Sequence, residues 1–240
     1  MALNARRWPR SVTSSRKNDA RFDGRLSRYY NYSRVVSLCH FEQLVERHGL
    51  RQQAHVGVVS GSRREPELNL LSAEQVSVLS FEDDPRFDLD VEWPESAAFS
   101  LTLCSQVLEH VFHPHIAFAN LCRVTRPGGS IYVSIPSINC IHAEPYYFSA
   151  GYHPRFLDRL GRENGCQLLG LGAWGSLKYM LHAVSGRWLA ARQLGPGLNS
   201  RFDIHLPLHM LADGRKNMAL TPMPIMTDCW ALFRRADGGH

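Results

Sequence analysis

The chain has 240 residues, of which 44% are hydrophobic and 20% are charged, and its formal net charge is +5. A chain of this length and composition can bury one sizeable core, so we expect a globular domain and not a disordered or fibrous protein. No apolar run approaches the roughly 20 residues of a membrane-spanning helix, and no secretory signal is visible, so we expect a cytoplasmic protein.

Basic residues are concentrated near the N-terminus. Residues 1–35 contain nine Lys and Arg residues but only two Asp, an excess of seven positive charges. We predict that residues 1–34 form a basic, flexible arm and that residues 35–240 form the folded domain. A basic arm can attract nucleic acid, lipid or an acidic partner. Its aromatic residues form no regular RNA-binding pattern, so we expect a solvated arm and no nucleic-acid partner.

The first half of the domain alternates between helical and strand patterns. Apolar residues recur at helical spacing before Gly49, which suits the end of that helix. Short apolar runs that end in small or acidic residues then indicate strands. We predict helices at 35–48 and 65–71, strands at 56–59 and 76–80, and a third-strand region at 87–90.

The stretch from Phe99 to Pro136 organises the rest of the chain. It reads as a buried strand at 99–104, a polar turn, a helix at 114–124 and a second buried strand at 130–135. Pro114 suits the first turn of that helix, and Pro-Gly-Gly at 127–129 ends it. Both strands are mainly apolar, which is typical of a parallel sheet with helices on both faces. Ligands bind at the carboxyl ends of strands in such sheets, so the polar turn is the first place to look for chemistry.

The second half continues the alternation. A loop rich in His, Glu and Tyr at 137–153 should lie over the same sheet edge as the polar turn. A helix at 154–164, a strand at 167–171 and a last strand at 227–233 follow. Residues 174–227 are longer than a plain connection, so they are predicted to be an insertion. The stretch 199–224 is expected to be irregular, and the apolar helical face at 176–192 also suits a homodimer interface.

The motif Leu108-Glu109-His110-Val111, followed at the right spacing by Arg123-Val124-Thr125-Arg126-Pro127-Gly128-Gly129, resembles class I methyltransferases that use S-adenosylmethionine (SAM). The resemblance covers about residues 56–171 and the last strand, and it is closest to the branch that acts on small molecules and glycans. It implies a Rossmann-like, doubly wound α/β fold with a mostly parallel sheet and an antiparallel last strand. It also implies SAM as cofactor, a small-molecule or glycan substrate, and a substrate lid in the insertion at 174–227.

The resemblance is weakest at the loop after the first strand. In this family an acidic residue and then Gly-x-Gly-x-Gly usually stand there, whereas this chain has Val58 at the acidic position and Ser60 at the first glycine. The resemblance assigns Ser60 and Gly61 to the cofactor. Arg63 or Arg64 would meet the carboxylate of the methionine moiety, unless both are ordinary surface residues.

Acidic residues after the next strands complete the expected cofactor cleft. The resemblance assigns Glu82 to the ribose hydroxyls, because an ionised carboxylate accepts two hydrogen bonds. It assigns Asp88, or alternatively Asp90, to the adenine amino group. Ser105 and Gln106 at the start of the polar turn line the same cleft.

The expected reaction is methyl transfer to a hydroxyl of a small molecule or sugar, which needs a base. We assign His142 as that base, with His110 shaping the methyl-transfer pocket and Glu144 as the alternative base. The six cysteines are dispersed without a C-x-x-C pair, which favours a reducing cytoplasm, and we assign no metal ligands. The competing hypothesis is a catalytically inactive binding or scaffold protein that keeps the methyltransferase fold, which the departures at Val58 and Ser60 favour.

Overall fold

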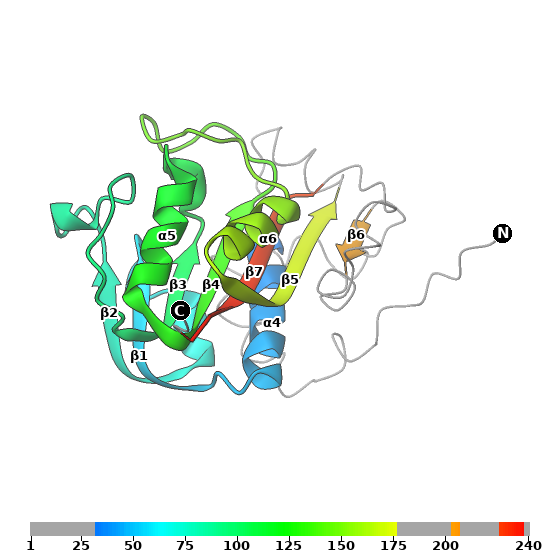
Figure 1. The fold of residues 1–240 in the computed structure, drawn as a ribbon. Coiled ribbons are helices and arrows are strands. Elements are labelled where there is room, and N and C mark those ends of the chain that lie inside the picture. Colours follow the sequence, from blue (N-terminus) through cyan, green and yellow to red (C-terminus); the bar gives the residue numbers. More distant parts are fainter. Residues whose placement is uncertain (1–31, 177–202, 207–225, 238–240) are drawn as a thin grey trace.

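The computed structural model describes residues 32–176, 203–206 and 226–237 of the chain. A seven-stranded sheet with the strand order β2-β1-β3-β4-β7-β5-β6 forms its centre (Figure 1). The strands are β1 Gln52–Val59, β2 Ser72–Leu79, β3 Phe99–Ser105, β4 Thr125–Pro136, β5 Cys166–Ser176, β6 Asp203–Leu206 and β7 Asp228–Arg235. The helices are α4 Tyr32–Arg47, α5 Pro114–Val124 and α6 Pro154–Glu163, with short 3-10 helices η2 Pro66–Leu70, η3 Pro85–Phe87 and η4 Leu108–His110.

The sheet topology confirms the predicted fold class. Strand β1 pairs in parallel with β2 on one side and with β3 on the other, and β3 pairs in parallel with β4. Strand β7 runs antiparallel to both of its neighbours, β4 and β5. Because the chain leaves β1 toward β2 and later returns to its other side at β3, the strand order switches at β1. This switch point is where ligands bind in open α/β sheets.

Two hydrophobic cores cover the two faces of the sheet. Successive side chains of β7 point to opposite faces of the sheet. Ala231 and Phe233 belong to the core under α5 and α6, whereas Trp230 and Leu232 belong to the core under α4. Figure 1 accordingly shows α4 on the opposite side of the sheet from α5 and α6. Burial of one large apolar side chain contributes about 1.5–3 kcal/mol, so both faces stabilise the sheet that carries the site.

Helix α6 approaches the sheet through a glycine. A Cβ on Gly161 would collide with the ring of Phe233 in β7. The helix starts where the side chain of His153 accepts the N–H of Arg155, and it is followed by Gly165 with φ of 66°. Glycine adopts this left-handed backbone without steric cost, which allows the chain to turn into β5.

Two local predictions were wrong. The region 87–90 is a 3-10 helix and a turn, because the carboxylate of Asp88 accepts the N–H of Asp90 and the backbone turns instead of extending. The helix predicted at 65–71 is present as the short 3-10 helix η2, Pro66–Leu70. The stretch 199–224, which was expected to be irregular, contains strand β6, and its backbone extends the sheet beside β5.

Other differences concern the boundaries of the domain. Helix α4 begins at Tyr32, so the last three residues of the predicted arm belong to a helix. Arg34 in this helix is buried and forms an ion pair with Glu67. Strand β5 includes residues 174–176, the first three of the predicted insertion. The arm before residue 32, the helical pattern at 177–189 and nearly all of the proposed dimer face at 176–192 lie outside the described residues. Within the described part of the chain, no helix is both long and apolar enough to cross a membrane.

Candidate active site

The loop after β1 packs too closely for a side chain at its glycine. Ser60 has φ of 49°, in the left-handed region that favours glycine. A Cβ on Gly61 would come within 2.9 Å of both Glu65 Oε1 and Val58 Cγ1. The N–H of Ser62 donates to Glu65 Oε1 over 3.3 Å. The chain therefore keeps a tight small-residue turn at the carboxyl end of β1, although it carries one glycine there.

A buried ion pair joins four elements at the switch point. The guanidinium of Arg34 on α4 lies 2.8 Å from the carboxylate of Glu67 on η2 and 3.5 Å from that of Glu65. It also donates to Ser134 Oγ on β4 over 3.0 Å, and Ser105 Oγ at the end of β3 donates to Glu67 over 2.8 Å. Glu67 is fully buried. The carboxyl ends of β3 and β4 are thus tied to α4 through charge-assisted hydrogen bonds, which are roughly twice as strong as neutral ones.

Sequence reasoning missed Arg34 and Glu67. Arg34 was counted with the basic arm, but it lies four residues before Leu38 and seven before Phe41, both of which are fully buried on α4. That spacing places Arg34 on the inward face of the helix. A basic residue at an inward position calls for a buried carboxylate partner, and this was the signal that could have found the pair. No local pattern indicates that the partner is Glu67, 33 residues away.

Gln106 and Asp228 form a second polar contact at the same strand ends. Gln106 has φ of 58°, and its backbone N–H donates to the carbonyl of Ser134 over 2.7 Å. Its side-chain amide donates to Asp228 Oδ1, at the start of β7, over 3.2 Å. Burial raises the pKa of Asp228 to about 7, against the opposing effects of Arg34 and of the Gln106 hydrogen bond. The predicted residues Ser105 and Gln106 therefore lie at one edge with charged groups that the sequence did not indicate.

Glu82 and Asp88 lie after β2, on the other side of the switch point. Glu82 is exposed, and its backbone N–H donates to Ser80 Oγ over 3.3 Å. One oxygen of Asp88 accepts the N–H of Asp90 over 2.9 Å, and its carbonyl accepts Trp93 Nε1 over 2.6 Å. Asp90 in turn accepts backbone N–H groups from the loop before α5. Asp88 and Asp90 thus hold the turn together, and the carboxylate of Glu82 faces solvent.

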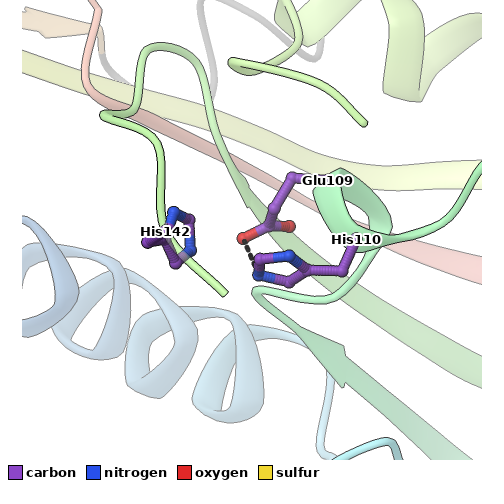
Figure 2. Close-up of side chains that lie close together, drawn as sticks. All are labelled: Glu109, His110 and His142. Carbon is purple, nitrogen blue, oxygen red and sulfur yellow. Dashed lines mark ion pairs between the residues drawn. The ribbon is translucent and has the colours of Figure 1, made fainter. Parts of the chain in front are cut away.

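Glu109, His110 and His142 come together beyond the end of β3 (Figure 2). His110 Nε2 lies 3.8 Å from Glu109 Oε1, and the two imidazole rings meet edge to face with their centroids 4.7 Å apart. Glu109 is 1% exposed, whereas His142 is exposed. Burial raises the pKa of Glu109 to about 8. The sequence singled out both histidines but gave no role to Glu109.

The loop at 137–150 lies over η4, as predicted from the order of the strands. The backbone N–H groups of Phe148 and Ser149 both donate to the carbonyl of Glu109, over 3.1 and 3.2 Å. The carbonyl of Tyr146 contacts His110 Nδ1 over 2.6 Å. These contacts bring His142 to the cluster from a separate part of the chain. Glu144 is in the same loop and is exposed.

Comparisons with known proteins identify the family of this chain. A family model described as a methyltransferase domain matches residues 24–179, which is well over half of the chain. The chain therefore belongs to this methyltransferase family, and the predicted family is confirmed. It is a SAM-dependent methyltransferase of class I. The comparison with curated proteins found no match.

Three solved structures of low sequence identity are similar to this chain, and the first of them shares its fold. The [4+2]-cyclase SpnF is 16% identical with a TM-score of 0.50, over 88% of this chain and 84% of that chain. The N-methyltransferase NodS from Bradyrhizobium japonicum, in complex with S-adenosylhomocysteine, is 10% identical with a TM-score of 0.48, over 94% and 97%. A 1,6-didemethyltoxoflavin-N1-methyltransferase from Burkholderia thailandensis is 12% identical with a TM-score of 0.47, over 99% and 93%.

The residues at the switch point suit the cofactor of this class. The methionine end of SAM carries an ammonium and a carboxylate, so it needs an anion and a cation side by side. Arg34 and the partly exposed Glu65 provide such a pair, and burial together with the charge of Glu67 raises the pKa of Glu65. Arg63 and Arg64, which were predicted to meet the carboxylate, are both exposed. The switch point therefore offers charged groups of the two kinds that the methionine end of SAM needs.

Proposed function

We propose that this protein transfers the methyl group of SAM to a hydroxyl of a small molecule or sugar. The observation that carries the proposal is the cluster of Glu109, His110 and His142, which stands just after the cofactor-facing residues Ser105 and Gln106. A hydroxyl must lose its proton as it is methylated, and this cluster offers proton acceptors at the place where the methyl group is expected.

The cofactor side of the proposed cleft is built from loops at the strand ends. Arg34 and Glu65 would hold the two charges of the methionine end, and the tight turn at Ser60 and Gly61 lets the backbone approach the ligand. Glu82 would accept the ribose hydroxyls, and Asp88 would use its remaining carboxylate oxygen for the adenine. These polar groups orient the cofactor, and when bound it supplies an electrophilic methyl group on a sulfonium.

His142 is the proposed base. Its Nδ1 lies 2.9 Å from the carbonyl of Cys140, which is an acceptor only, so Nδ1 carries the proton of the neutral ring. Nε2 then carries the lone pair that can accept the proton of an acceptor hydroxyl. His110 and the buried Glu109 bound the pocket on the other side. Glu144, exposed in the same loop, is the alternative base.

The test is turnover with a panel of acceptors, measured as release of S-adenosylhomocysteine. Each hydroxyl acceptor is paired with its deoxy analogue, and the active compound is then used with His142→Ala, His110→Ala and Glu144→Gln. A positioned base contributes about 10²–10⁴-fold, so His142→Ala should lower turnover by that order while SAM affinity stays unchanged. His115→Ala is the matched control, because this histidine on α5 has a 64% exposed side chain.

Two results would count against the proposal in different ways. Full turnover by both His142→Ala and His110→Ala would remove the histidines as base and leave Glu144 or positioning alone. Tight SAM binding without turnover on any acceptor would favour the alternative of a catalytically inactive binding or scaffold protein. That alternative rests on the departures from the family pattern at Val58 and Ser60. The backbone of Ser60 has the positive φ that a glycine would adopt, which argues against the alternative.

A further inference from the structure

The carboxylate of Glu109 has an unsatisfied oxygen. Glu109 is 1% exposed, and among the described residues its Oε2 has no hydrogen-bond partner. Its other oxygen, Oε1, lies 3.8 Å from His110 Nε2, which is beyond hydrogen-bonding distance. Figure 2 shows that Oε1, the oxygen joined to His110 by the dashed line, is on the side of His142, whereas the other oxygen is on the far side of the carboxylate. A buried carboxylate with an unpartnered oxygen is costly, and a cation held by this carboxylate would offset part of that cost.

Both imidazoles are oriented in the way that metal-binding histidines are. His110 Nδ1 lies 2.6 Å from the carbonyl of Tyr146, and His142 Nδ1 lies 2.9 Å from the carbonyl of Cys140. A carbonyl accepts and cannot donate, so in each neutral ring the proton is on Nδ1 and the lone pair is on Nε2. A hydrogen bond from the second nitrogen to a backbone carbonyl is the usual way in which a metal-ligating histidine is fixed.

We propose that Glu109, His110 and His142 bind a divalent cation of the zinc or cobalt type. The ligand atoms lie within 4.8 Å of one another. Metal–ligand distances of about 2.0–2.2 Å in a tetrahedral site place ligand atoms roughly 3.4 Å apart. The pair of Glu109 and His110 is already near that spacing, at 3.8 Å. The exposed loop that carries His142 has to move inward by about 1 Å to close the site.

The chemistry of the donors selects the cation. Two imidazole nitrogens and one carboxylate suit zinc and related transition metals, whereas magnesium and calcium prefer oxygen ligands. Three protein ligands leave the fourth position open, as in catalytic zinc sites.

The use of the cation in catalysis rests on the proposed function. Coordination of the acceptor hydroxyl would lower its pKa, as zinc does for bound water, and its proton would leave to solvent. The alkoxide oxygen would then form the new O–C bond while the C–S bond of SAM breaks and S-adenosylhomocysteine leaves. In this cation-bound form His142 is a ligand, so it is not also the base.

The experiment is a titration of tag-free, chelator-treated full-length protein with Co²⁺, followed by absorbance and calorimetry in the absence of SAM. We expect one equivalent of tightly bound Co²⁺ with visible bands of low-coordinate geometry, and competition by Zn²⁺. His142→Ala and Glu109→Gln should weaken binding by roughly 100-fold or more, beyond the effect of losing a supporting hydrogen bond. His115→Ala should bind as the wild type does. Because His142 is exposed in a loop, its variant tests the site even if Glu109→Gln folds poorly.

Failure of this inference differs from failure of the proposed function. Absence of stoichiometric Co²⁺ binding, or equal affinity in wild type and His142→Ala, would overturn the cation site whatever the turnover. Stoichiometric binding that depends on the three residues would support the site even if no hydroxyl acceptor is ever methylated, which would overturn the proposed reaction instead. Turnover that is unchanged by chelation would refute the catalytic use of the cation.

Discussion

Replacement of Arg34 by alanine tests the network that organises the switch point. The variant removes the 2.8 Å ion pair to Glu67 and the 3.0 Å hydrogen bond to Ser134. Glu67 is 0% exposed, so the variant leaves a buried carboxylate with Ser105 as its remaining donor. Removal of one partner of a buried ion pair typically costs 3–5 kcal/mol, and we expect Arg34→Ala to lower the free energy of unfolding by about this amount.

The assay is urea unfolding followed by the fluorescence of the buried tryptophans, with the slope checked for two-state behaviour. The double variant Arg34→Ala, Glu67→Gln should recover part of the loss, because its buried group is neutral. Arg51→Ala is the control, since this arginine is 45% exposed and lies 3.9 Å from Glu46, and it should cost less than about 1 kcal/mol. A loss for Arg34→Ala as small as that of Arg51→Ala, or no recovery in the double variant, would refute the buried ion pair.

Two further predictions concern the carboxylates. Glu82→Ala should weaken SAM binding by about 1.5–3 kcal/mol, the contribution of hydrogen bonds to a charged group, and an unchanged dissociation constant would remove Glu82 from the site. Burial raises the pKa of Asp228 to about 7, against the opposing effects of Arg34 and of the Gln106 hydrogen bond. The folded state therefore keeps a proton that the unfolded state releases, and stability falls as pH rises from the unfolded pKa of about 4 toward 7. Asp228 is partly exposed, which reduces the size of this effect. Between about pH 5 and pH 8 in metal-free buffer, we expect the free energy of unfolding of Asp228→Asn to fall by about 2 kcal/mol less than that of the wild type. Identical pH profiles of wild type and variant would contradict this.

Elements whose signals are local were predictable from the sequence. Helix α5 runs from Pro114 to Val124, as predicted, because its proline start and its apolar spacing are both within the segment. The Pro-Gly-Gly at 127–129, which was expected to end the helix, lies inside strand β4. The parallel pairing of β3 and β4 followed from their apolar character and the helix between them. The contact between the loop at 137–150 and η4 followed from the strand order, which brought His110 and His142 together.

Features that depend on long-range contacts, or on competition between a local hydrogen bond and strand extension, were not predictable. The partner of Arg34 is set by how α4 crosses the strand ends, which the helix pattern alone does not specify. The region 87–90 was predicted as the third strand because it matches that region of the family. There the side chain of Asp88 bonds to the backbone two residues on, and this local hydrogen bond favours a turn over extension. Glu109 had no signal at all, because an acidic residue in a polar turn reads as solvated until its burial is seen.

The most direct test of the account is calorimetry of the wild-type protein with SAM, S-adenosylhomocysteine and methylthioadenosine. In the proposed complex, the methionine end of the cofactor lies against Arg34 and Glu65, at the carboxyl ends of the strands on either side of the switch point. We expect SAM and S-adenosylhomocysteine each to bind with one equivalent. Methylthioadenosine lacks the charged amino-acid end, so it should bind at least about tenfold more weakly, which is 1.4 kcal/mol. Absence of binding by both SAM and S-adenosylhomocysteine, or equal affinity for methylthioadenosine, would contradict the account.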